Sequence, residues 1–261
     1  MPFSLTKVLS ARYLCPDYVV DSSMTIRNYK RLLTIILVVS GALLLGCAVK
    51  QGLLTDEGKV TVTTNLSSVS QADIDRVRSE AEKALQNICP ILGVQNNKSV
   101  NIRIVQGGIC NAYGGVISVP IWHVRNKKAA IVHEVTHIIA KHSENRFFSE
   151  GLAVYFQERF GEDKGFPNFA GVPLNDLVKK YKDQLMPISQ LADNNEIFRQ
   201  VGTEKRKIAY IEAGSFVNYL VEEYGEQKLK ELHDSWSLNY KSIYSKDLKE
   251  LAIEWQEFVF E

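Results

Sequence analysis

Two histidines and a glutamate occur within five residues, in the segment HEVTH at positions 133–137. In a helix of 3.6 residues per turn, His133 and His137 lie one turn apart on one face, so their imidazoles can converge on one ion. Glu134 would then stand beside a water held by that ion and could accept its proton. A pattern this short arises by chance in roughly one chain of this length in a hundred, so other residues must support it.

A metal centre of this kind needs a third ligand, because a catalytic zinc ion takes three protein ligands and leaves a fourth position for water. One known arrangement uses a histidine six residues after the second, but Ser143 occupies that position. Glu150 lies 13 residues after His137, in the segment FFSEGLAVYF. The residues between them are long enough to turn the chain back, so a second helix can pack against the first. Gly151 is small and would let two helices approach closely.

Together, these two segments resemble the gluzincin metallopeptidases, in particular the compact bacterial peptidases of the thermolysin-like superfamily. The resemblance spans roughly residues 100–232 and includes AYIEAGSFVNYLVEEYGEQKLKEL from position 209. It implies one zinc ion per chain, a peptide or protein substrate, and Glu134 as the general base. It also implies an oxyanion-stabilising side chain on a later helix, for which Tyr210 is the candidate. The implied zinc ligands are His133, His137 and Glu150.

Two other classes of function stay open from the sequence. One is a non-catalytic envelope lipoprotein that keeps zinc only for its structure, and the other is a zinc hydrolase that cuts a non-peptide bond. The presence of Glu134 favours an enzyme, because a structural site does not need a carboxylate beside an open metal position. For Tyr210, a plain packing role within a helix is as open as the catalytic one.

Three strands and a series of helices are expected to position these residues, from the spacing of apolar side chains. The strands are expected at residues 59–65, 99–105 and 116–119. The third strand precedes the HEVTH helix and is expected to be an edge strand. Its free backbone groups would then be able to pair with an extended peptide.

The helix that carries HEVTH is expected at about residues 127–141, capped by Asn126, and it is apolar nearly all round, which predicts burial. An earlier helix is expected to begin after Ser70, which acts as its N-cap, and to end before Pro90. Later helices are expected from near residue 149, at 206–223 with Gly225 as the C-cap, at 226–235 and at 246–260.

This order of elements predicts an α+β fold. Its N-terminal lobe, at about residues 59–142, would be mixed, with a small β-sheet and the HExxH helix. Its C-terminal lobe, at about residues 143–261, would be helical. The resemblance to gluzincins makes residues 59–261 a zinc metallopeptidase-like domain.

The N-terminal segment has the layout of a secretory signal peptide. A basic stretch after Met24 is followed by an uncharged apolar run at residues 32–45 and then by Leu-Leu-Gly-Cys, which ends at Cys47. This ending resembles a bacterial lipobox, in which the signal is cut before a cysteine that carries a diacylglycerol. We therefore expect a signal peptide at residues 1–47, with Met24 as a possible true start, and a tether at 48–58.

The alternative to this lipid anchor is a single N-terminal transmembrane helix, because residues 32–49 form 18 mostly apolar residues, at the short end of what spans a bilayer. Both interpretations attach the protein to a membrane and place its domain in the cell envelope, facing the periplasm or the exterior.

The remaining composition limits the partners and the disulfides. The 261 residues carry a net charge of +1 with no basic run, which argues against nucleic acid as a partner. Cys89 and Cys110 follow the signal segment, and an oxidising compartment makes a disulfide between them possible. Two buried thiols are the alternative.

Overall fold

The computed structural model of the chain describes residues 59–162 and 171–261. The predicted signal peptide, its lipid-bearing Cys47 and the tether lie outside these residues and stay predictions. Within the described part of the chain, no helix combines the length and the apolar character needed to cross a bilayer.

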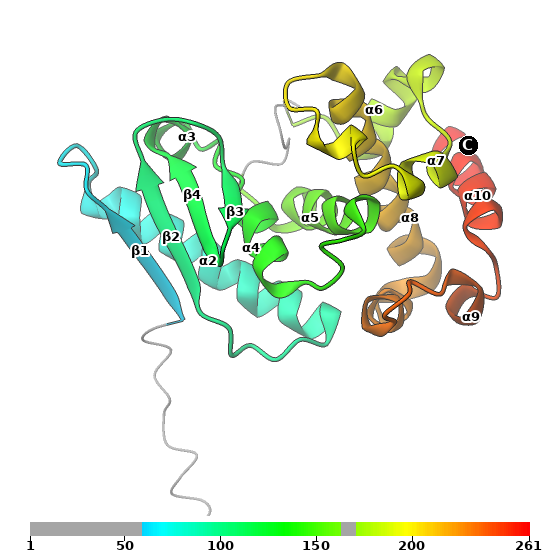
Figure 1. Ribbon diagram of the computed structural model, residues 1–261, viewed down its shortest axis with the longest axis horizontal. Coiled ribbons are helices and arrows are strands. Elements are labelled where there is room, and N and C mark those ends of the chain that lie inside the picture. The colour runs from blue at the N-terminus through cyan, green and yellow to red at the C-terminus, as the bar shows by residue number, and fades with distance from the viewer. Residues whose placement is uncertain (1–58, 163–170) are drawn as a thin grey trace, which may run out of the picture. The chain divides into compact units, whose positions relative to one another are not determined.

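A small mixed sheet forms the N-terminal part of the fold (Figure 1). Its strand order is β1-β2-β4-β3, with β1 (Val60–Thr64), β2 (Val100–Val105), β3 (Asn111–Tyr113) and β4 (Val116–Pro120). The first three strands of that order run parallel, whereas β3 is antiparallel to β4. Strand β2 alternates buried and exposed side chains, so one face of the sheet packs on the core and the other meets solvent.

The expected edge position of the third predicted strand is wrong, because β4 is paired on both sides. The edge belongs to β3, a strand of three residues that is too short for an alternating pattern to reveal. Gly114 and Gly115 join β3 to β4 with φ angles of 57° and 79°. Two successive positive φ angles suit a two-residue hairpin turn, and glycine adopts them without steric cost.

Helix α2 (Gln71–Leu92) connects the parallel strands β1 and β2. Ser70 caps it, since its side chain accepts a hydrogen bond from the backbone N–H of Asp73, as expected. The helix does not end before Pro90 but continues to Leu92. Pro90 removes one backbone hydrogen bond near the end of the helix. Gly93, with φ 64°, is the residue that ends it.

The HEVTH helix, α4 (Ile131–Ile139), is shorter than predicted at both ends. Asn126 does not cap it but ends a separate short helix, α3 (Ile121–Arg125), and its side chain donates a hydrogen bond to the Trp122 carbonyl. Lys127 then adopts φ 54°, a left-handed conformation that interrupts any helix. At the other end, Ala140 is extended, so the chain leaves α4 before Lys141.

The remaining described elements are helical, and with the sheet they confirm the predicted α+β class. Helix α5 (Arg146–Phe160) begins three residues earlier than expected because Asn145 caps it. Helix α8 is broken at Gly225, where φ is 82°, so the two helices predicted on either side of this glycine are confirmed. The other elements are α6 (Leu174–Lys180), η1 (Lys182–Gln184), α7 (Ile188–Asp193), η2 (Ile197–Arg199), α8 (Glu204–Asp234), α9 (Tyr240–Tyr244) and α10 (Leu248–Phe260).

Helices α5 and α8 approach each other closely through glycines on both sides. A Cβ atom at Gly151 would stand 2.7 Å from the Ala213 carbonyl oxygen, and one at Gly214 would stand 2.5 Å from Val154 Cγ1. Gly151 was expected to serve the contact between α5 and the HEVTH helix, but its own close contact is with α8. These glycines therefore fix how α5 and α8 present their side chains to the metal centre described next.

Candidate metal centre

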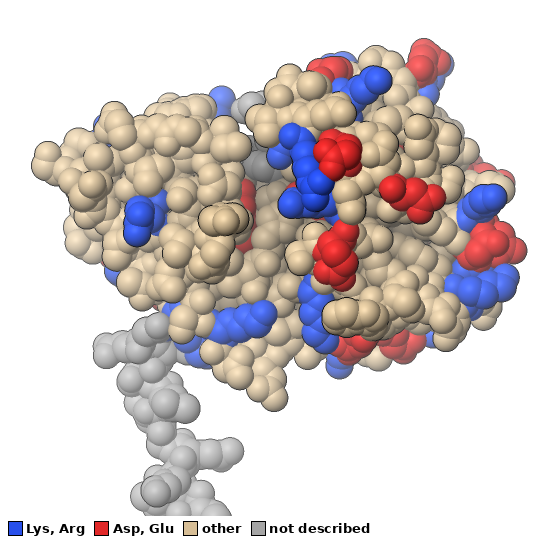
Figure 2. All heavy atoms as spheres, viewed as in Figure 1, with Lys and Arg blue, Asp and Glu red and all other residues tan. Residues whose placement is uncertain are grey.

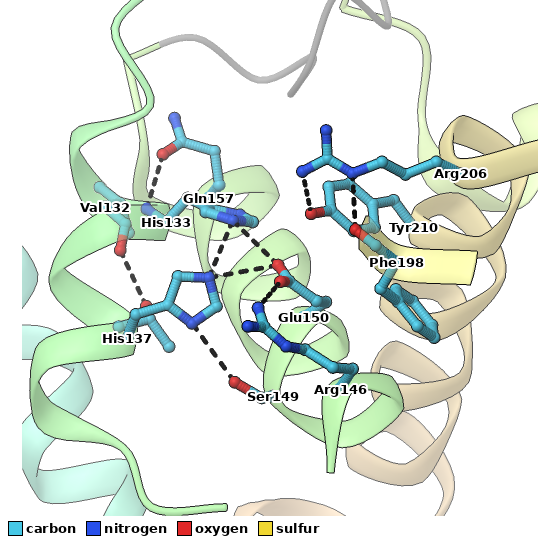
Figure 3. A network of polar contacts seen from close by, with 11 residues as sticks. Val132, His133, His137, Arg146, Ser149, Glu150, Gln157, Phe198, Arg206 and Tyr210 are labelled. Carbon is cyan, nitrogen blue, oxygen red and sulfur yellow. Dashed lines mark hydrogen bonds and ion pairs between the residues drawn. The ribbon is translucent and has the colours of Figure 1, made fainter. Parts of the chain in front are cut away.

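His133, His137 and Glu150 bring three potential ligand atoms together, as the sequence predicted. The two Nε2 atoms are 3.1 Å apart, and Glu150 Oε2 lies 3.3 Å from His133 Nε2 and 3.2 Å from His137 Nε2 (Figure 3). Tetrahedral coordination at about 2.05 Å places ligand atoms about 3.3 Å apart. The three atoms therefore fit three corners of a tetrahedral metal site.

Two packed helices create this arrangement. The four-residue spacing places both histidines on one face of α4, and Glu150 projects from the first part of α5, which packs against α4. His133 and Glu150 are each only 3% exposed, whereas the His137 side chain is 20% exposed. Burial makes three converging lone pairs unfavourable unless a cation or protons lie between them, and this favours a bound metal ion.

Polar side chains of α5 contact both histidines. The Ser149 hydroxyl lies 3.3 Å from His137 Nδ1, the ring nitrogen that faces away from the centre. The backbone N–H of His133 donates to Gln157 Oε1 at 3.0 Å, which ties α4 to α5 beside the first ligand. The Ser149 contact fixes the orientation of the His137 ring and supports its affinity for a metal.

Arg146 lies beside the third ligand. Its Nη1 atom is 3.2 Å from Glu150 Oε1, so the oxygen that does not face the histidines is the one that meets the guanidinium. Burial raises the pKa of Glu150, but the neighbouring histidines outweigh it and hold that pKa well below its usual range. Glu150 is therefore a carboxylate at neutral pH, as a metal ligand must be.

The two histidines titrate differently in the absence of a metal. Burial lowers the pKa of His133 to about 4, so its imidazole is neutral and able to ligate at physiological pH. Burial also lowers the pKa of His137, but the Glu150 carboxylate offsets this and leaves the pKa above its ordinary value. Metal binding must therefore displace a proton from His137 over part of the neutral range.

Glu134 is buried next to the ligands without being one of them. It is 4% exposed, and burial raises its pKa to about 7. The nearby His137 and the backbone N–H of Ala112, in β3, favour the charged carboxylate, whereas Glu150 opposes it. A carboxyl group with a pKa near neutrality suits proton transfer at physiological pH.

Tyr210 also reaches the centre, from α8. Its ring centroid is 6.1 Å from that of His133, and burial raises the pKa of its hydroxyl, which therefore stays protonated. Arg206 Nη2 donates to the Tyr210 hydroxyl at 2.6 Å, and Arg206 Nε donates to the Phe198 carbonyl at 2.8 Å. Figure 3 shows this pair on the α8 side of the centre, across from the histidines.

The sequence prediction named Tyr210 but missed the other groups that surround the candidate ligands. Arg206 stands four residues before Tyr210 on one helix, a spacing that signals contact and could have revealed this partner. Ser149 directly precedes Glu150, but nothing local marks it as a partner of His137. The contact from Ala112 depends on the placement of β3, which the sequence pattern does not predict.

Of the two alternatives left open for Cys89 and Cys110, the structure has free thiols and no disulfide between them. Lys59 and Lys98, which precede β1 and β2, are close enough to Cys89 to lower the pKa of its thiol, although burial raises that pKa overall. Cys110 lies beyond the other end of β2, with its Sγ 3.6 Å from His123 Nδ1. Opposite ends of one strand are too far apart for a disulfide, which needs Cα atoms within about 7 Å.

Comparisons with known proteins identify no relative of the chain. No protein-family model matches it, and the comparisons with curated proteins and with solved structures found no match. The metal centre is therefore interpreted from its own geometry and chemistry.

Proposed function

We propose that the chain is a membrane-anchored zinc metallopeptidase that hydrolyses peptide bonds in the cell envelope. The observation that carries this proposal is the triangle of His133, His137 and Glu150 ligand atoms with the buried Glu134 carboxyl beside it. A site that only held the metal for structural reasons would gain nothing from burying a second, non-ligating carboxyl group there.

The donor set supports zinc as the metal. Two imidazoles and one carboxylate are the ligands of a well-known class of catalytic zinc sites, which keep a fourth position open. The spacings of 3.1–3.3 Å between the ligand atoms fit tetrahedral coordination, which zinc prefers. Magnesium or calcium would instead favour a site built mainly from oxygen ligands.

The protein groups around the site have distinct roles in peptide hydrolysis. Bound zinc would supply Lewis acidity, which lowers the pKa of a coordinated water and polarises the substrate carbonyl. Glu134 accepts the proton of the attacking water and delivers it to the leaving amine. The protonated Tyr210 hydroxyl donates a hydrogen bond to the developing oxyanion. Arg206 positions that hydroxyl, since its guanidinium contacts both Tyr210 and the Phe198 carbonyl.

Strand β3 offers a binding edge for the substrate backbone. Among the described strands it pairs only with β4, it lies against α4, and Ala112 within it contacts Glu134. An extended peptide that adds to this edge would run past the metal centre. The proposed membrane attachment rests on the predicted signal segment and on Cys47. It places the peptidase in the cell envelope.

The test compares the full chain with Glu134→Gln, and with Glu144→Gln as a matched control at an exposed glutamate. Zinc content is measured in each, and cleavage of an unfolded protein is followed. We expect one zinc per chain in all three, and cleavage lost only in Glu134→Gln. Zinc without cleavage in any variant would favour a structural lipoprotein or a non-peptide bond, and absence of zinc would refute the metal site.

A further inference from the structure

A hollow of about 230 Å³ opens beside the metal centre. One wall is β3 and the turn after it, from Ala112 to Gly115, and the other is the end of α4 with the start of α5. Figure 2 shows a recess on this face between the sheet and the helices. His137 and Ser149 line both the hollow and the metal centre, so whatever occupies the hollow lies next to the ligands.

The size of the hollow suits one side chain or one chain end. Pockets that enclose a whole small-molecule ligand typically measure about 300–1,000 Å³, which is larger than this space. Nothing lies within 4 Å of the place where a Cβ atom would stand at Gly114 or at Gly115, so the turn leaves the entrance open. A peptide that adds to the edge of β3 would place side chains near this entrance.

The lining of the hollow is positively charged. Among its described lining residues are two cations, Lys141 and Arg146, and no carboxylate. The hydroxyls of Ser143 and Ser149 add hydrogen-bonding groups. A third cation, Lys98, stands against the same wall, since its Nζ donates to the Ile138 carbonyl oxygen at 3.1 Å.

The acidic neighbours of these cations leave them able to bind an anion. Arg146 contacts Glu150 through Nη1, but a guanidinium carries five N–H donors, and Glu150 also faces the two histidines. Lys141 Nζ lies 3.3 Å from Asp234, where the two side chains are 57% and 50% exposed, so solvent weakens this pair. Asp234 does not line the hollow.

We infer that this hollow is a subsite for a carboxylate of the substrate, bound by Lys141 and Arg146. The inference rests on the proposed function, because it takes a peptide along β3 as the ligand. The carboxylate belongs either to an aspartate or glutamate side chain or to the C-terminus of the peptide. Both sources present the same two oxygens, which a guanidinium and an ammonium bind in the same way.

Binding is measured first, because it does not depend on cleavage. The full chain carrying Glu134→Gln is loaded with zinc and immobilised, and a random-sequence peptide library is passed over it. The library is supplied once with free C-termini and once with C-terminal amides, and retained peptides are identified by mass spectrometry. We expect carboxylate-bearing peptides to be enriched about fivefold over neutral ones. This is the gain in affinity that one partly exposed charge pair contributes.

Variants at the two ends of the Lys141–Asp234 pair change this enrichment in opposite directions. Lys141→Met lowers it below about twofold and Lys141→Arg restores it, because only the first removes the charge. Asp234→Asn raises it, because it removes the competing carboxylate. Lys249→Met, at an exposed lysine on α10, is the matched control and leaves the enrichment unchanged.

The two library forms separate the sources of the carboxylate. Enrichment of acidic residues in both forms identifies a side chain, and enrichment confined to free C-termini identifies the chain end. No retention, no enrichment, or an enrichment that Lys141→Met leaves unchanged would overturn the subsite. Retained peptides are then offered to the wild-type chain, and failure to cut them would refute the peptidase proposal while the subsite stands.

Discussion

Replacing Gly151 with alanine tests the close approach of α5 and α8 that positions Glu150. An added Cβ would stand 2.7 Å from the Ala213 carbonyl oxygen and 3.0 Å from Val217 Cγ2. The carbonyl belongs to the backbone and cannot rotate away, so the helices must separate. Overpacking destabilises the fold by about 1–3 kcal/mol. The higher helix propensity of alanine stabilises it by up to about 1 kcal/mol, which offsets part of that loss. We expect the free energy of unfolding to fall by about 1–2 kcal/mol.

Urea unfolding of the zinc-free full chain measures this loss, since bound zinc would add its own binding free energy to the folded state. Zinc affinity should fall as well, because the displaced residue adjoins the ligand Glu150. Gly107→Ala is the control, since no atom lies within 4 Å of its added Cβ, and we expect a change within about 0.5 kcal/mol. A Gly151→Ala chain with wild-type stability and zinc affinity would refute the packing argument.

Three further substitutions test individual groups. Tyr210→Phe should lower kcat in peptide-cleavage assays about a hundredfold at unchanged zinc content, because it removes one hydrogen-bond donor to the oxyanion. An unchanged kcat would show that Tyr210 serves only for packing. Ser149→Ala removes the partner of His137 Nδ1 and should weaken zinc binding about tenfold in a chelator competition assay, whereas unchanged affinity would contradict that role. Burial raises the pKa of Glu212 from 4.5 to about 8, so the folded state holds a proton there that the unfolded state has lost. The free energy of unfolding, measured by urea titration, should therefore fall by about 2–5 kcal/mol as pH rises from 4.5 to 8. Glu212→Gln, which keeps an acceptor for the Met186 N–H, should abolish this pH dependence.

The convergence of the three candidate ligands was predictable because local spacing determines most of it. A separation of four residues places His133 and His137 on one helical face wherever that helix lies in the fold. Glu150 required only that the next helix turn back, and the intervening chain is long enough for this. Strands β1 and β2 and helix α10 were likewise predicted from apolar periodicity alone.

Other features depended on single residues or on distant contacts. The start of the HEVTH helix was misplaced because Asn126 ends the preceding helix, and Lys127 adopts a positive φ that its residue type does not signal. Strand β3 was missed because three residues show no periodicity. The close contact of Gly151 with α8 was not predicted, because the position of α8 is set by tertiary packing.

A zinc K-edge X-ray absorption spectrum of the purified full chain tests the metal centre most directly. The proposed function predicts one zinc per chain, with two imidazoles and only nitrogen and oxygen ligands at about 2.0–2.2 Å. In the Glu150→Gln chain, zinc should bind more weakly. Sulfur ligands at about 2.3 Å, which would implicate Cys89 or Cys110, or a chain that binds no zinc, would contradict the centre formed by His133, His137 and Glu150.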